Sequence, residues 1–240
     1  MLIQSTGAFT FGEESPYEFE ATYQLKYLLS SALISLDYIE FPNQKNFQKF
    51  PNEIQYYRYY LDHLFFLIGQ IHDRFIIKNN NSNSIKKECI KLNRNNYGFD
   101  ENKYVTISNK VPRNIIEHLD ERSLYTIEHN GSVGGFNVIF QNSEKEFINT
   151  IKNQREFYPY ILNLIDNVVH FHNFQTNNSK VIDFDISLKK LREEILILSK
   201  NVDNIYSFFV NTTIWNRHKD KTSDTHPTRI LCIRYFGFLI

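Results

Sequence analysis

The chain has 240 residues, of which 42% are hydrophobic and 22% charged, with only 8 glycines and 6 prolines. This composition excludes disordered and collagen-like proteins, and the length suffices for a sizeable core. The 27 basic and 27 acidic side chains cancel. No net charge therefore points to a nucleic acid or a membrane surface, and any such role has to rest on local patches.

The sequence contains no apparent membrane span, secretory signal or cysteine motif, and these features bear on the location of the protein. Its apolar runs are far shorter than the roughly 20 residues of a membrane span. The N-terminal segment carries early acidic residues in place of the basic start of a secretory signal. Cys89 and Cys232 stand in no motif, which favours two free thiols. We therefore expect a cytoplasmic protein that does not bind membranes.

The first half of the chain predicts an N-terminal arm over residues 1–16 followed by helices. Apolar residues recur at helical spacing over residues 17–39, again from 51 to about 77, and again after residue 108 to about residue 125. Pro112 suits the first turn of the last of these helices. A short basic helix is expected between the polar loop at residues 78–84 and a break at residues 95–100.

The second half mixes short strand signals with a long helix. Residues 136–140 are typical of a strand, and residues 169–174 and 181–184 predict a β-hairpin. Helices are expected over residues 144–156 and 159–169. Residues 188–209 carry apolar side chains in alternating steps of three and four, the seam of a helix that packs along its whole length.

These elements predict a mainly α protein, a helical bundle with a small β-hairpin insertion. Residues 1–210 are expected to form a single domain. Residues 211–240 form a tail that is first basic and then apolar, and the sequence predicts no structure for it.

The segment with the most chemical information is Arg113–Arg122. On one continuous helix, Asn114, His118 and Arg122 share a stripe at spacings i, i+4 and i+8. Arg113 and His118 lie about 140° apart around an ideal helix. They meet on one phosphate only if the first helical turn is distorted or if a second subunit completes the site.

These residue types suit RNA cleavage without a metal. An imidazole can remove the proton of a 2′-hydroxyl or protonate the leaving oxygen. The guanidinium of Arg113 can stabilise charge on the transition state, and Asn114 can orient the imidazole or a phosphate oxygen. The expected products are a 2′,3′-cyclic phosphate and a 5′-hydroxyl.

The pattern Arg-Asn-x-x-Glu-His-x-Asp-Glu-Arg resembles the HEPN superfamily (higher eukaryotes and prokaryotes nucleotide-binding domains), most closely uncharacterised bacterial members. The resemblance covers residues 17–205 and implies an HEPN-like helical bundle. It also implies a metal-independent endoribonuclease without a cofactor, whose active site is built from two protomers, acting as a toxin or phage-defence effector. RNA, a second copy of the chain and an antitoxin protein are the implied partners.

The resemblance also assigns residues. It carries Arg113, Asn114 and His118 over as the catalytic group. Four further positions match the signature without an implied role and are candidates for supporting the site: Glu117, Asp120, Glu121 and Arg122.

A basic segment is the candidate RNA-binding surface. Residues 74–96 hold six basic side chains against Glu88 alone: Arg74, Lys78, Lys86, Lys87, Lys91 and Arg94. Such a segment can follow an RNA backbone. It can equally be a solvated helix face.

Other interpretations of the candidate residues stay open. The motif can be a charged helix face with a pair between Arg113 and Glu117. An HEPN-like domain can also be a non-catalytic module that dimerises or binds a partner through the seam of residues 188–209 and the apolar tail. A second Arg-x4-His, Arg58 to His63, lies in the middle of a predicted helix among aromatic residues. We predict a structural role for it.

A metal site is a further possibility in the predicted hairpin. His170 and His172 share one face of a strand, and Asp183 or Asp185 lies across from them. A plain surface strand is the preferred interpretation of these residues, and no metal is assigned.

Overall fold

The structure is a computed structural model that describes residues 16–77, 84–128, 132–133, 136–141, 156–157, 159–175 and 180–216. The contacts within the chain divide it into two compact units. The first unit combines Met1–Ser30, Asp73–Lys103 and Leu196–Ile240, and the second combines Ser31–His72 and Tyr104–Ile195. The helices α1 and α8 contribute to both units.

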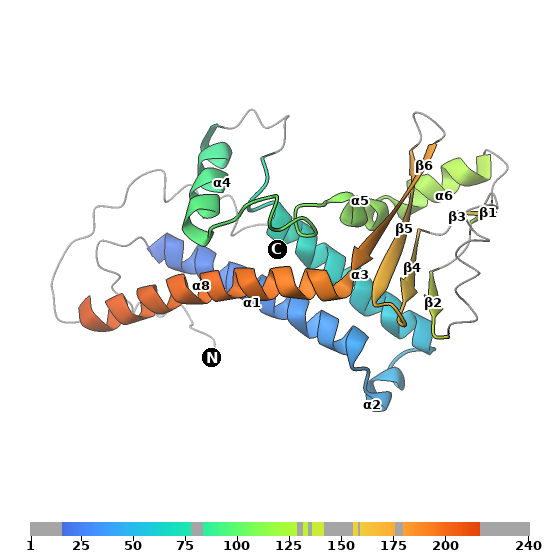
Figure 1. The fold of residues 1–240 in the computed structure, drawn as a ribbon, viewed down its shortest axis with the longest axis horizontal. Helices are drawn as coiled ribbons and strands as arrows, with labels where there is room; N and C mark the ends of the chain where they lie inside the picture. Colours follow the sequence, from blue (N-terminus) through green and yellow to red (C-terminus); the bar gives the residue numbers. More distant parts are fainter. Residues whose placement is uncertain are drawn as a thin grey trace. The chain divides into compact units, whose positions relative to one another are not determined.

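The long helices agree with the predicted ones to within a few residues, except at the ends of α3 and α8 (Figure 1). Their bounds are α1 Pro16–Glu40, α3 Glu53–His72, α4 Ser84–Tyr97 and α8 Leu188–Asn216, with a short α2, Gln44–Phe47, between α1 and α3. The α3 helix stops five residues before the predicted end, and α8 continues seven residues beyond it. The described part of the chain is mainly α, as predicted.

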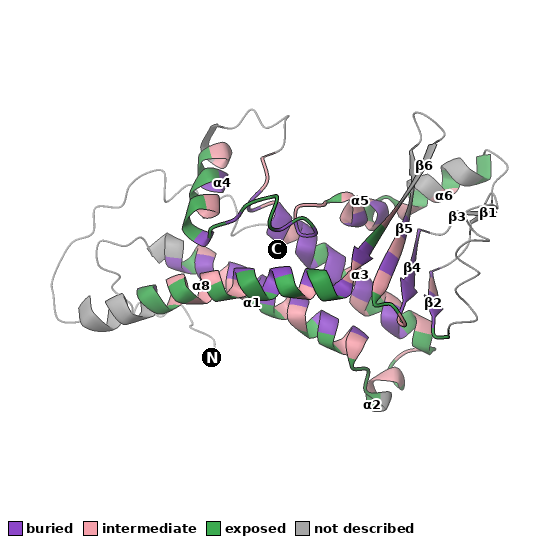
Figure 2. Cartoon of the chain, viewed as in Figure 1, coloured by how far each residue is buried: buried purple, intermediate pink, exposed green. Residues whose placement is uncertain are grey.

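The seam of α8 is buried within the chain. Buried and exposed positions alternate along this helix (Figure 2). The predicted seam has seven apolar residues, of which Ile205 is half-buried. The other six are buried: Leu188, Leu191, Ile195, Leu198, Val202 and Phe209. Because the chain itself covers them, this seam is not available as a surface for a second copy.

In the first unit, aromatic side chains join the beginning of α1 to the end of α8. The ring of Phe19 stacks on Tyr206 at 5.4 Å between centroids and meets the edge of Phe209 at 6.3 Å. An ion pair joins Lys26 to Asp203. The unit therefore depends on contacts between residues far apart in the sequence.

The second unit contains a four-stranded sheet, which is larger than the predicted hairpin. Its strands lie in the order β2-β4-β5-β6. Their bounds are β2 Asn137–Ile139, β4 Tyr160–Asn163, β5 Val168–Gln175 and β6 Lys180–Ser187. Strands β2 and β4 are parallel, and the other pairs are antiparallel. A two-residue β1, Ser132–Val133, pairs with β3, Glu156–Phe157.

The predicted helix over residues 159–169 is wrong, because β4 and a turn occupy it. All four residues of β4 are buried. A strand buried on both faces is a continuous apolar run without period-2 alternation, so its sequence cannot be distinguished from a buried helix. The predicted helix over residues 144–156 lies outside the described residues except for its last position.

The core of the second unit lies between α3 and the sheet. The ring of Phe65 on α3 meets the edge of Phe171 on β5 at 5.0 Å. Phe171 also stacks on Phe184 of β6 at 5.1 Å. The hydroxyl of Tyr160 on β4 donates to the carboxylate of Asp62 on α3. These contacts fix α3 across the strands.

A buried carboxylate on α8 organises the loop before the candidate site. Glu194 is 4% exposed. It accepts hydrogen bonds of 3.0 Å from the backbone N–H groups of Thr106 and Ile107 and from the hydroxyl of Thr106. A buried charge is tolerated only when it is satisfied in this way.

The structure bears on two of the predictions about location, the absence of a membrane span and the free thiols. In the described part of the chain, no helix combines the length and apolar character needed to cross a membrane. The prediction of a free thiol is wrong for Cys89, because its sulfur is bonded in a disulfide. Cys232 lies outside the described residues.

Candidate active site

The predicted catalytic motif begins on α5, Val111–Glu117. The side-chain oxygen of Asn109 accepts a hydrogen bond of 3.0 Å from the backbone N–H of Val111. Pro112 occupies the first turn, where its missing N–H costs no helical bond, and it is buried together with Ile115. These contacts fix the start of α5, as the sequence predicted.

The helix does not continue through the motif, and this corrects the predicted single helix. Helix α5 ends at Glu117, His118 has φ −114° and ψ 30°, and a second helix, α6 Leu119–Glu128, follows. Helix α5 packs on α3 and β5, whereas α6 packs on β1. Because the two halves pack on different elements, the helix is interrupted at the residue between them, His118. Figure 1 draws α5 and α6 as two separate helices.

This break changes the geometry of the motif. Asn114 lies on α5, Arg122 lies on α6, and His118 joins the two helices. The three residues therefore do not form one continuous stripe. The distortion lies at the histidine, not in the first turn next to Arg113.

Arg113 is held by its own helix. Its Nε donates to Oε1 of Glu117 at 2.6 Å, and its side chain is 24% exposed. This is the pair that the charged-face interpretation predicts. It leaves Arg113 positioned and accessible in part, which suits a group that binds an anion.

The other motif residues have different surroundings. Asn114 is half-buried, and His118 and Asp120 are exposed. Glu121 and Arg122 belong to α6, and their side chains lie outside the described part of the chain.

Arg74, the first residue of the proposed RNA-binding segment, is buried. Arg74 is 8% exposed and donates to Oε1 of Gln24 at 3.2 Å. Burial lowers the pKa of its guanidinium to about 10, so the group stays charged at neutral pH. Because Arg74 is buried in the first unit, it offers little surface to an RNA, and we do not retain it as an RNA contact.

The remaining basic residues differ in exposure. Lys86 and Lys87 on α4 are half-buried, and Lys91 is exposed. Arg94 pairs with Glu101 at 2.8 Å. Lys78 lies outside the described residues. Three lysines of α4 thus remain as the candidate RNA surface.

The second Arg-x4-His pair is held in contacts within α3 and with α1. Nε of Arg58 lies 3.6 Å from Oδ2 of Asp62. Nδ1 of His63 shares a hydrogen bond of 2.9 Å with the hydroxyl of Ser35, and its ring stacks near Tyr59. These contacts agree with the structural interpretation.

The carboxylate of Asp62, next to Arg58 and His63 on α3, has a shifted pKa. Burial raises the pKa of Asp62, against the lowering effects of the Tyr160 hydroxyl and of Arg58. Burial and the neighbouring Asp62 carboxylate raise the pKa of Tyr160. The phenol therefore stays protonated and donates to the carboxylate, which is a structural use of both groups.

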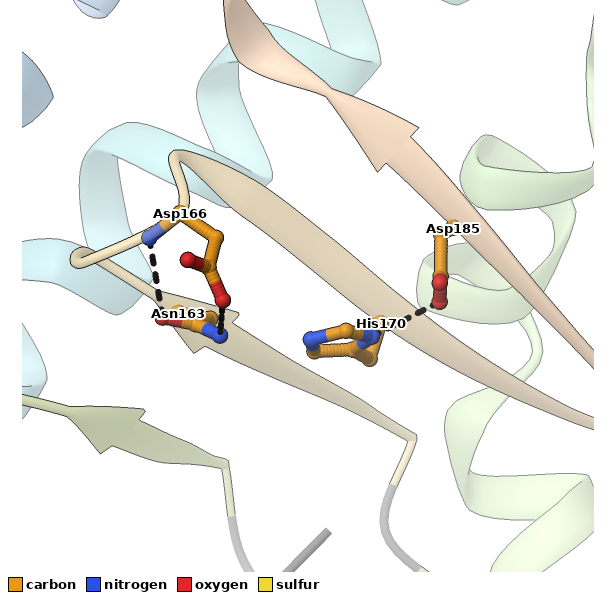
Figure 3. Close-up of polar contacts among 4 residues, drawn as sticks. All are labelled: Asn163, Asp166, His170 and Asp185. Atoms are coloured by element: carbon orange, nitrogen blue, oxygen red, sulfur yellow. Dashed lines mark hydrogen bonds and ion pairs between the residues drawn. The ribbon is translucent and has the colours of Figure 1, made fainter. Parts of the chain in front are cut away.

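In the hairpin, a carboxylate orients the imidazole of His170. Nδ1 of His170 and Oδ1 of Asp185 are joined by a hydrogen bond of 2.7 Å, while the buried Nε2 has no hydrogen-bond partner among the described residues. Figure 3 shows Asp185 on one side of the ring, with Asn163 and Asp166 beyond the other side. A carboxylate often orients a metal-binding histidine in this way.

A metal centre nevertheless does not follow from this pair. No group of three metal-ligating side chains lies in the part of the chain that the structure describes. The backbone register pairs His172 with Asp183, but the side chains of both residues are not described.

No family model, no curated protein and no solved structure matches the chain. The resemblance to the HEPN superfamily therefore rests on the sequence motif from Arg113 to Arg122.

Proposed function

We propose that the protein is a metal-independent endoribonuclease of the HEPN type, acting in the cytoplasm as a homodimer and as a toxin or phage-defence effector. An antitoxin or an activator is the proposed protein partner. Fractionation of cells that make the native protein tests the proposed location.

The proposed reaction uses three residues. The 2′-oxygen of a ribose attacks the adjacent phosphorus while the bond from phosphorus to the 5′-oxygen breaks. His118 moves a proton, taking it from the 2′-hydroxyl or giving it to the 5′-oxygen. Arg113 stabilises the charge on the phosphate, and Asn114 orients the imidazole or a phosphate oxygen. The products are a 2′,3′-cyclic phosphate and a 5′-hydroxyl.

The observation that carries this proposal is the helix break at His118. It places an exposed histidine at the end of α5, where Arg113 is already held by Glu117. A histidine in the middle of a continuous helix would be fixed about 140° from Arg113. At a helix end the imidazole is released from that constraint and can approach a phosphate bound at Arg113.

The first test is RNA cleavage in excess EDTA by the intact protein. We expect cleavage products that end in a 2′,3′-cyclic phosphate and a 5′-hydroxyl, because the proposed mechanism needs only side chains. Cleavage that requires added magnesium, or products with 3′-hydroxyl ends, would contradict the proposed reaction.

The α4 lysines give a separate prediction. Replacing Lys86, Lys87 and Lys91 by glutamine should weaken RNA binding and flatten its dependence on salt, since each lost phosphate contact reduces the salt slope by about 1. The measurement is fluorescence anisotropy of a labelled RNA at several salt concentrations. Replacing the paired Arg94 is the control, and an unchanged slope in the triple variant would exclude α4 from the RNA path.

The second candidate function is a non-catalytic interaction module. The buried seam of α8 no longer supports it, but α6 exposes Leu124 and Ile127 at 63% and 59%. An exposed apolar helix face is typical of a protein–protein contact. Absence of cleavage together with stable self-association would favour this function.

A further inference from the structure

The side chain of Arg113 packs against a glycine of α3. It lies against α3 at Gly69, a buried residue. A Cβ atom built on Gly69 would lie 1.9 Å from Cδ of Arg113, 2.8 Å from Nε and 3.0 Å from Cγ. No side chain can occupy that position while Arg113 stays where it is.

Glycine is an unfavourable choice for this position on other grounds. Gly69 lies inside the 20-residue α3, and glycine is among the weakest helix formers. The structure gives it no left-handed φ. The close approach of Arg113 is the feature of the surroundings that requires a residue without a side chain.

We propose that Gly69 is a positioning residue for Arg113, and this inference rests on the proposed ribonuclease function. The missing side chain leaves a notch in α3 through which the stem of Arg113 passes. Glu117 then holds Nε by accepting its hydrogen bond. Together they fix the point at which the guanidinium meets an RNA phosphate.

The notch itself can be tested without any activity. In the wild-type background, Gly69→Ala should lower the midpoint of thermal unfolding, because the new methyl group displaces Arg113. In an Arg113→Ala background the same substitution should raise the midpoint, because alanine favours a helix and nothing is left to displace. A change of the same sign in both backgrounds would overturn the proposed notch.

The positioning role needs a readout that folding alone does not change. The control is Ile68→Val, at a buried neighbour on α3, which loses packing but leaves the notch intact. All proteins are assayed in EDTA well below their unfolding midpoints. We expect Gly69→Ala to lower kcat by at least about tenfold with KM nearly unchanged, as for a contact made in the transition state, and Ile68→Val to stay within about twofold of wild type.

The outcomes separate this inference from the function on which it rests. Wild-type cleavage together with full kcat in Gly69→Ala would overturn the positioning role and leave the proposed function intact. An inactive wild type that binds no RNA would remove the proposed function and the phosphate role of Arg113. The unfolding measurements would then still decide whether the notch exists.

Discussion

His118→Ala is expected to slow RNA cleavage in EDTA by about 10²–10⁴-fold, the usual contribution of a general acid or base. The imidazole is exposed at the end of α5. Its removal creates no cavity in the core, so the unfolding midpoint should stay close to that of the wild type. The cleavage rate and the midpoint should be measured on the same preparation.

The matched control is His63→Ala, in the second Arg-x4-His of the chain. His63 is also exposed, but its Nδ1 is engaged with Ser35. We expect this variant to keep its cleavage rate. Cleavage that survives both substitutions would show that the motif is not the active site, or that the activity belongs to a contaminant.

Glu194→Ala is expected to lower the free energy of unfolding by at least about 3 kcal/mol. The substitution leaves the N–H groups of Thr106 and Ile107 and the Thr106 hydroxyl without their acceptor. Each buried donor left unpaired costs about 1–3 kcal/mol. Urea unfolding followed by circular dichroism measures the loss.

The neighbouring Glu193 provides the control, because it lies on the same helix and is exposed. Glu193→Ala should change the free energy of unfolding by no more than about 0.5 kcal/mol. Equal effects from both substitutions would mean that the carboxylate of Glu194 contributes nothing beyond its helix propensity. Glu194→Gln should fall between the two, since it keeps one acceptor oxygen.

The long helices could be predicted because their apolar residues follow a single period. The buried residues of α8 are those of its sequence pattern almost throughout. Strand β4 could not be predicted, because a strand buried on both faces has no alternation. The break at His118 carries neither glycine nor proline, and it arises because α5 and α6 pack on different elements.

In the candidate site, contacts within one helix could be predicted from the sequence, whereas contacts between distant residues could not. The pair of Arg113 with Glu117 follows from their spacing on a helix. Arg74 contacts Gln24, which is distant in the sequence. The sequence showed only the charge of Arg74, and a charged side chain is expected to be exposed. Gly69 offered one signal, a glycine within an otherwise strong helix pattern, but its partner Arg113 lies 44 positions later in the chain.

The contact between Phe19 and the end of α8 has a consequence for synthesis on the ribosome. Phe19 is among the first residues of α1, whereas Tyr206 and Phe209 leave the ribosome almost 190 residues later. The aromatic face of α1 therefore remains uncovered during most of translation. A chaperone that binds nascent apolar segments has this face as a target until α8 has been made.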